Sequence, residues 1–153
     1  MDGIVIKRLD ADLLGGAHEL EKLCFSSPWS ESALSILCGE SGVGFAAVES
    51  ESGRVLAYGG MLTVLDEGQI TNIATHPDAR RRGLGRAVVG ALLEYGIENG
   101  VNMFSLEVRE SNVGAIALYE SFEFECVGVR KNFYSAPCEN GIVMTKIMGD
   151  TAK

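Results

Sequence analysis

An arginine- and glycine-rich segment is the first part of the chain whose residue types could bind a ligand. It runs from Arg80 to Arg86, reads Arg-Arg-Arg-Gly-Leu-Gly-Arg, and stands directly before the strongest helical pattern of the sequence. Glycines let a ligand approach backbone N–H groups, a helix N-terminus offers unpaired donors and partial positive charge, and arginines add cationic groups. The segment therefore predicts an anion site. A solvated basic turn is the alternative, because such turns are frequent and one Gly-x-Gly is a weak signal.

The spacing within this segment argues against two common nucleotide-binding loops. No Gly-Lys-Ser/Thr follows the glycines, as it would in a phosphate-binding loop. Val88 occupies the position of the third glycine in the Gly-x-Gly-x-x-Gly dinucleotide pattern. Neither of these two common nucleotide-binding patterns is therefore present.

Glu107 is a second candidate for chemistry. Phe104, Leu106 and Val108 alternate on one face of an apolar segment, so the opposite face of this predicted strand carries the carboxylate. A carboxylate that is partly buried there could accept a proton, directly or through a water molecule. The alternative is an ordinary salt bridge to an arginine.

Apolar periodicity predicts the elements that must position these residues. Strands and helices alternate in an order typical of a mixed sheet flanked by helices, the α/β or α+β class. The strand, helix and strand between residues 69 and 108 form a βαβ crossover, so its two strands should be parallel neighbours. Strands are expected at residues 4–9, 45–49, 55–65, 68–75, 103–108, 125–130 and 141–147, and helices at 13–24, 30–39, 84–98 and 112–121.

The composition indicates a folded globular protein. The chain has 153 residues, of which 46% are hydrophobic, and we expect one domain over residues 1–148 with a short disordered tail at 149–153. A net charge of -8 argues against nucleic-acid binding and suits a basic partner, although solubility alone also explains it.

Other function classes lack their usual signals. No Cys-x-x-Cys pair occurs and His18 lies far from His76, so we expect no metal site and four reduced cysteines. The first ten residues do not resemble a signal peptide, and no stretch reaches the roughly 18 apolar residues of a membrane span. We therefore expect a cytoplasmic protein that does not enter a membrane.

The arginine- and glycine-rich segment resembles the acyl-CoA loop of the GNAT superfamily of N-acetyltransferases. That loop reads Arg or Gln, two residues, Gly, one residue, Gly or Ala, and Arg80, Gly83 and Gly85 fit it. The resemblance implies a GNAT fold, a twisted mixed sheet of about seven strands flanked by about four helices. It also implies acetyl-CoA as co-substrate. The residues implied to bind the pyrophosphate are Arg80, Arg81, Arg82, Gly83, Leu84, Gly85 and Arg86, and those implied to bind the pantetheine arm are Ile73, Ala74 and Thr75.

The resemblance narrows to the RimI group, the ribosomal-protein-alanine acetyltransferases, and covers nearly the whole chain. Its signatures are found at residues 25–30, 65–67, 72–74, 106–112, 118–120 and 130–134. Similarity to this group implies that Glu107 is the general base, that Tyr119 is the general acid and that Asn112 contacts the cofactor. It also places Trp29 and Tyr134 beside the acceptor. Without the resemblance, Tyr119 is better interpreted as an ordinary core aromatic, Trp29 equally well as a core anchor, and Asn112 as a helix N-cap.

The resemblance implies acetyl transfer from acetyl-CoA to the N-terminal alanine of the eighteenth small-subunit ribosomal protein, a basic partner. A base is needed because an α-amino group, with a pKa of roughly 7.7 to 8.0, is mostly protonated at neutral pH. Direct attack needs no covalent enzyme intermediate. Two alternatives remain open: the acceptor is another protein N-terminus, a lysine or a small amine, or the chain is a non-catalytic acyl-CoA-binding module.

Two positions depart from the RimI pattern. Glu123 stands where relatives commonly have a glycine after the helix that carries Tyr119, and Phe133 stands where a tyrosine is usual. If the turn at Glu123 is left-handed, the side chain costs about 1 kcal/mol there.

Overall fold

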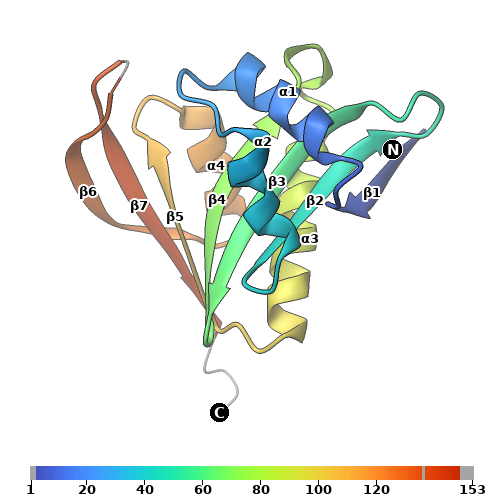
Figure 1. Cartoon of the computed structure of the whole chain (residues 1–153). Coiled ribbons are helices and arrows are strands. Elements are labelled where there is room, and N and C mark those ends of the chain that lie inside the picture. Colours follow the sequence, from blue (N-terminus) through green and yellow to red (C-terminus); the bar gives the residue numbers. More distant parts are fainter. Residues whose placement is uncertain (1–2, 136, 149–153) are drawn as a thin grey trace.

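The computed structural model describes residues 3–135 and 137–148, so the tail expected at 149–153 lies outside the described residues. It contains one seven-stranded sheet with helices on both faces (Figure 1). The strands are β1 (Ile4–Arg8), β2 (Gly42–Glu49), β3 (Val55–Val64), β4 (Glu67–Thr75), β5 (Met103–Arg109), β6 (Glu125–Tyr134) and β7 (Glu139–Ile147). The helices are α1 (Leu14–Cys24), α2 (Glu31–Leu34), α3 (Leu84–Glu98) and α4 (Val113–Ser121), with 3-10 turns η1 (Ser35–Cys38) and η2 (Pro77–Ala79).

The sheet is mixed, as predicted. Its strand order is β1-β2-β3-β4-β5-β7-β6. The β4–β5 pair is parallel, whereas the other neighbours are antiparallel. The predicted βαβ crossover is therefore confirmed, with α3 connecting the two parallel strands. The last strand, β7, is inserted between β5 and β6.

The parallel pair is short and then opens. Pairing between β4 and β5 covers only residues 67–69 and 103–105. Beyond it, β4 stays on β3 as far as Thr75, while β5 continues along β7. A register shift in β4, where Gly60 pairs with Asn72 and Met61 with Ile70, makes Thr71 an extra residue, and such bulges bend a strand. The two strands therefore diverge toward their C-terminal ends (Figure 1).

Each face of the sheet buries its own apolar cluster. Helices α1 and α2 pack on one face with Leu9, Ala46 and Tyr58, and helices α3 and α4 cover the other face with Met61 and Phe104. Close contact on the first face requires Gly16 in α1, because a Cβ there would lie 2.6 Å from Val55 Cγ2. Packing thus explains a glycine that local propensity disfavours in a helix.

The structure refines two predicted elements. The helix expected at residues 30–39 is a four-residue α-helix followed by the 3-10 turn η1. Its predicted N-cap is confirmed, because Ser30 Oγ accepts a hydrogen bond from the backbone N–H of Ala33 at 3.0 Å. Strand β6 continues to Tyr134, four residues past its predicted end.

Helix α4 ends in the left-handed turn considered above. Glu123 has a φ of 72°. The N–H of Phe124 donates to the carbonyl of Tyr119 at 3.1 Å, and the N–H of Glu123 donates to Glu120 at 2.8 Å. Such a C-terminal turn favours glycine, because a Cβ is strained in this conformation. The departure from the family pattern therefore falls on a strained residue.

We expect Glu123→Gly to raise the free energy of unfolding by about 0.5 to 1 kcal/mol. Relief of backbone strain outweighs the greater freedom of glycine in the unfolded chain. The contact between Glu123 Oε1 and Lys146 Nζ, at 3.7 Å, lies largely at the surface and contributes little. Urea denaturation measures the change, with Glu123→Ala as the matched control that removes the carboxylate and keeps the strain. Equal stability of the two variants would contradict the assignment.

Candidate active site

The loop before α3 has the backbone geometry of an anion site. Arg81 and Gly83 both have left-handed φ angles, of 67° and 79°. Gly83 is the N-cap residue of α3, where no side chain caps the helix. A Cβ built on Gly83 would have no heavy atom within 4 Å, so open space lies beside this helix start. Uncapped N–H groups next to open space fit a phosphate group.

The four arginines of this loop differ in their contacts. Arg80 Nε donates to the carbonyl of Thr75 at 3.4 Å. Arg86 Nη1 donates to Ser121 Oγ at 2.9 Å, and its guanidinium lies 5.6 Å from the centre of the Phe122 ring. These two side chains therefore connect the loop to β4 and α4. Arg81 and Arg82 are exposed, and no ion pair engages them within the described residues.

The residues predicted for the pantetheine arm lie on the diverging part of β4. Ile73, Ala74 and Thr75 come after the last pair with β5, so the edge of β4 that faces β5 is unpaired there. The carbonyl of Thr75 accepts from Cys24 Sγ at 3.4 Å in addition to Arg80. Strand β4 leads through η2 directly into the arginine loop. The predicted cofactor residues other than Asn112 thus lie along one stretch of the chain, residues 73–86.

Glu107 lies on the open side of β5 and forms an ion pair. Phe104 and Leu106 are buried against α3, whereas the Glu107 side chain keeps 19% exposure on the opposite face. Arg130 Nε of β6 lies 2.7 Å from Glu107 Oε2. The salt bridge considered as an alternative is therefore present. Among the described residues, no hydrogen bond or ion pair engages Oε1.

Tyr134 lies near the Glu107 carboxylate, and Tyr119 lies near Tyr134. Burial raises the pKa of Tyr119, and the nearby phenol of Tyr134 adds to this. Burial also raises the pKa of Tyr134, the Glu107 carboxylate raises it further, and the Arg109 guanidinium opposes the shift. Both tyrosines therefore keep their protons at neutral pH. The structure brings Tyr134 of β6 near both Glu107 of β5 and Tyr119 of α4.

Arg109 fixes the tip of the β6–β7 hairpin beside this group. Its guanidinium lies 4.5 Å from the centre of the Tyr134 ring. Nη1 donates to the carbonyl of Pro137 at 3.0 Å and to Glu139 Oε1 at 3.2 Å. Hydrogen bonds from Ser111, followed by Arg109, lower the pKa of Glu139, which therefore stays ionised at neutral pH. Arg109 is a functional candidate that sequence reasoning missed.

Asn112 and Trp29 both have structural roles. Asn112 Oδ1 caps α4 by accepting from Ala115 N at 3.1 Å, and a contact to the cofactor stays a prediction. Trp29, in the loop between α1 and α2, packs partly against the cluster under α1. It also lines a groove of about 610 Å³ with Pro28 and Ile36. Figure 1 shows this loop and the β6–β7 tip at the same end of the sheet. No hydrogen bond joins Trp29 to the Glu107 group within the described residues.

A buried carboxylate on α1 was also missed. Glu21 is fully buried and accepts hydrogen bonds from Trp29 N, Asn72 Nδ2 and Tyr58 Oη. A signal was available, since Glu21 is four residues after Ala17 and therefore lies on the apolar stripe of the predicted helix. A charge on such a stripe requires buried partners.

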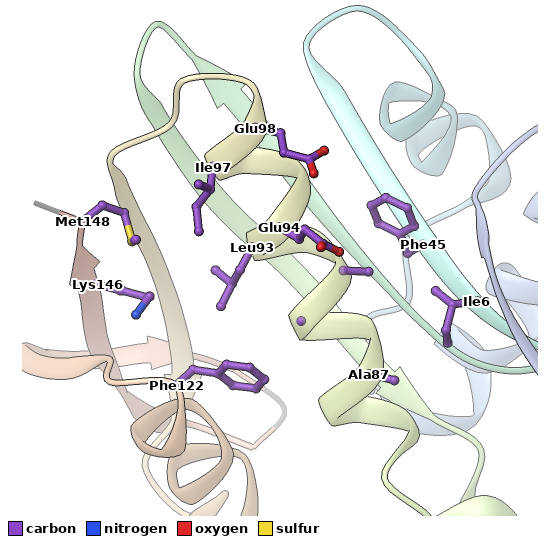
Figure 2. A pocket seen from close by; sticks show the side chains of 12 residues that line it. Ile6, Phe45, Ala87, Leu93, Glu94, Ile97, Glu98, Phe122, Lys146 and Met148 are labelled. Carbon is purple, nitrogen blue, oxygen red and sulfur yellow. The ribbon is translucent and has the colours of Figure 1, made fainter. Parts of the chain in front are cut away.

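A second hollow lies away from these residues. It has a volume of about 920 Å³ and runs along the outer side of α3 between Phe45, Leu93, Ile97 and Phe122 (Figure 2). None of the predicted site residues lines it. The described ranges contain no group of three His, Cys, Asp or Glu side chains that could hold a metal ion. They also contain no helix long and apolar enough to cross a membrane. All four cysteines are free thiols.

Comparison with known proteins agrees with this geometry. The model of the acetyltransferase (GNAT) family matches residues 14–124. The chain belongs to this family. The match begins at α1 and runs through β4, the arginine loop and β5 to the end of α4, so it covers all the predicted cofactor residues.

Relatives of this GNAT acetyltransferase extend the resemblance to the RimI group. The [ribosomal protein bS18]-alanine N-acetyltransferase of Escherichia coli K12 is 38% identical over 84% of this chain and 86% of its own length. The enzyme of the same name from Haemophilus influenzae is 34% identical over 92% and 96%. The crystal structure of the Escherichia coli ribosomal-protein-S18-alanine N-acetyltransferase superposes with a TM-score of 0.86, at 35% identity, over 96% of this chain and 95% of that chain. The predicted GNAT fold is confirmed.

We expect Gly83→Ala in this GNAT protein to weaken coenzyme A binding at least about tenfold, equivalent to 1.4 kcal/mol. The added Cβ enters the open space beside the uncapped N–H groups and strains a φ of 79°. Isothermal titration calorimetry with coenzyme A measures the effect. Gly90→Ala on the same helix is the control, because a Cβ there meets nothing closer than Phe122 Cζ at 4.0 Å. An unchanged affinity of Gly83→Ala would place the pyrophosphate elsewhere.

Proposed function

We propose that this GNAT acetyltransferase transfers the acetyl group of acetyl-CoA to the N-terminal alanine of ribosomal protein bS18. The observation that carries the proposal is the position of Glu107, just beyond the point where β4 and β5 part. It lies near the half-buried Tyr134, whose phenol in turn lies near the buried Tyr119. Relatives named for this reaction share up to 38% identity with the chain. The acidic net charge of -8 favours a basic acceptor.

In the proposed reaction, the acetyl donor lies along the unpaired edge of β4. Ile73, Ala74 and Thr75 offer backbone groups to the pantetheine arm, and the helix start at Gly83 and Leu84 holds the pyrophosphate. Exposed Arg81 and Arg82 add positive charge, and Arg80, Gly85 and Arg86 complete the segment. Asn112, at the start of α4, makes a further contact to the cofactor in this proposal. Acetyl-CoA supplies an activated thioester, so no covalent intermediate on the protein is needed.

Glu107 and Tyr119 move the protons. Arg130 holds one carboxylate oxygen of Glu107, which leaves Oε1 to accept a proton from the acceptor amine, directly or through water. The amine nitrogen bonds to the acetyl carbon and the carbon–sulfur bond breaks. Because burial raises the pKa of Tyr119, its phenol is protonated and can donate to the sulfur. An acceptor that enters as an ammonium loses two protons in all. One passes through Glu107 to solvent before the attack, and the second, lost from the nitrogen after the attack, balances the proton that the sulfur takes from Tyr119, whose phenol is then reprotonated.

The acceptor is placed between two loops. Tyr134 stands at the end of β6 beside Glu107, held by the Arg109 guanidinium. Trp29 lines the groove on the α1–α2 loop. In this proposal the N-terminal residue of the acceptor reaches Glu107, and the following residues pass between Tyr134 and Trp29.

A comparison of acceptors tests the proposal. Free-thiol release from acetyl-CoA is measured with the basic N-terminal peptide of bS18, with the same peptide blocked at its α-amine, with a lysine peptide and with spermidine. We expect turnover of the first peptide alone, because the site is built to deprotonate an α-amine. Turnover of the blocked peptide or of spermidine instead would assign a different acceptor, and release with none of them would indicate a binding module without chemistry.

Removal of the proposed base provides a second test. We expect Glu107→Gln to lower kcat/KM for the bS18 peptide by about 10²- to 10⁴-fold at neutral pH and to leave the affinity for coenzyme A unchanged. Glutamine keeps the size of the side chain and cannot take the proton. Glu125→Gln, an exposed change on β6, is the matched control. A Glu107→Gln enzyme as fast as the control removes Glu107 from the mechanism.

A further inference from the structure

The Glu21 side chain joins three elements from a fully buried position. Its Oε1 accepts from the backbone N–H of Trp29 at 2.8 Å. Its Oε2 accepts from Asn72 Nδ2 at 2.8 Å and from the hydroxyl of Tyr58. No lysine or arginine forms an ion pair with Glu21 in the described part of the chain. Hydrogen bonds therefore provide the stabilisation that a buried carboxylate requires.

Tyr58 and Asn72 both act as hydrogen-bond donors to the Glu21 carboxylate. Burial raises the pKa of Tyr58, and the hydrogen bond to Glu21 raises it further, so the hydroxyl stays a donor. Asn72 presents its Nδ2 to the carboxylate, since a carboxylate only accepts, and this leaves its buried Oδ1 without a partner. A buried amide oxygen without a partner costs free energy, so the hydrogen bond from Nδ2 to Glu21 must fix the orientation of the Asn72 amide.

Two side chains of α1 bind the backbone N–H and carbonyl groups of Trp29. His18 Nδ1 lies 2.9 Å from the carbonyl of Trp29, while Glu21 binds its N–H. His18 and Glu21 are three residues apart, so they lie on the same side of the helix. The α1–α2 loop, which has no regular structure at Trp29, is therefore fixed by two side chains that are not part of it.

The other end of the network lies on the diverging part of β4. Asn72 directly precedes Ile73 and comes after the last residue of β4 that pairs with β5. Glu21 thus connects the loop assigned to the acceptor with the strand assigned to the acetyl donor. We propose that Glu21 is a positioning residue that sets the acceptor loop relative to the donor strand, and this rests on the proposed function of both segments.

The test exchanges the carboxylate for an amide of the same size. Glu21→Gln carries one oxygen and one NH₂ group. The NH₂ group either faces the Trp29 N–H, which is a donor, or requires both Tyr58 and Asn72 to present acceptors instead of their present donors. We expect the KM for the bS18 peptide to rise about tenfold, the equivalent of losing 1.4 kcal/mol of binding free energy. The dissociation constant of coenzyme A should stay the same. Glu19→Gln is the matched control, because Glu19 is exposed on the same helix and pairs with Lys22.

A second measurement does not depend on the reaction. Trp29 is the only tryptophan of the chain, so its fluorescence reports on this loop alone. We expect acrylamide to quench Trp29 more strongly in Glu21→Gln than in Glu19→Gln. If Glu21→Gln does not fold, Tyr58→Phe removes one donor with little change of shape, and the same two shifts are expected at smaller size.

The outcomes separate the two proposals. Unchanged quenching and unchanged peptide KM overturn the role of Glu21, and so does a parallel loss of coenzyme A affinity, which would indicate general unfolding of the site. Absence of turnover with the wild-type chain contradicts the proposed function instead. In that case increased quenching in Glu21→Gln shows that the carboxylate holds the loop, whereas the link to an acceptor is rejected.

Discussion

The parting of β4 from β5 is the constraint on which the rest of the molecule depends. A parallel pair normally continues for the length of its strands, but here it stops after residues 67–69, where a bulge at Thr71 bends β4 while β5 continues along β7. The backbone groups along the opened edge of β4 have no strand to bind. An opening of this kind provides hydrogen-bonding groups for an extended ligand in the middle of a sheet, without an exposed outer edge.

The segments around this opening are held mainly by charged side chains. Arg109 binds carbonyls of the β6–β7 tip, Arg130 crosses β7 to reach Glu107, and Glu21 holds the α1–α2 loop. Loops of this kind bury few apolar side chains, so hydrogen bonds and ion pairs must fix them. The apolar clusters under the helices stabilise the sheet, whereas the polar contacts orient the loops and side chains of the candidate site. The loop from Arg80 to Arg86 is a local concentration of positive charge on a protein whose net charge is -8.

Local signals in the sequence predicted most of the elements. Alternation and helical spacing located all seven strands, and capping chemistry located Ser30 and Asn112. The crossover rule predicted that β4 and β5 are parallel. The position of β7 between β5 and β6 was not predicted, because a strand pattern does not specify the partner of the strand. The lengths of the second helix and of β6 were also wrong, since tertiary contacts decide where these segments end.

The parts of the candidate site that lie within a single segment of the chain could be predicted from the sequence. The arginine loop and Glu107 stood out by residue type and spacing, whereas Glu21, Arg109 and the Arg130 ion pair depend on contacts between segments far apart in the sequence. The sequence also presented the four arginines as equivalent. Arg80 and Arg86 in fact bind protein groups, and only the structure separates them from Arg81 and Arg82.

The insertion of β7 has a consequence for how the molecule is assembled. Strands β5 and β6, which carry Glu107 and Tyr134, are joined to each other only through β7, which follows both in the chain. Strand β6 pairs only with β7, whereas β5 is already paired with β4 over residues 103–105 and gains its second neighbour when β7 docks. The β5–β7 pairing joins segments far apart in the sequence, and such pairing forms slowly. The group around Glu107 and Tyr134 is therefore complete only when β7 has docked, whereas the arginine loop depends on contacts within its own βα unit.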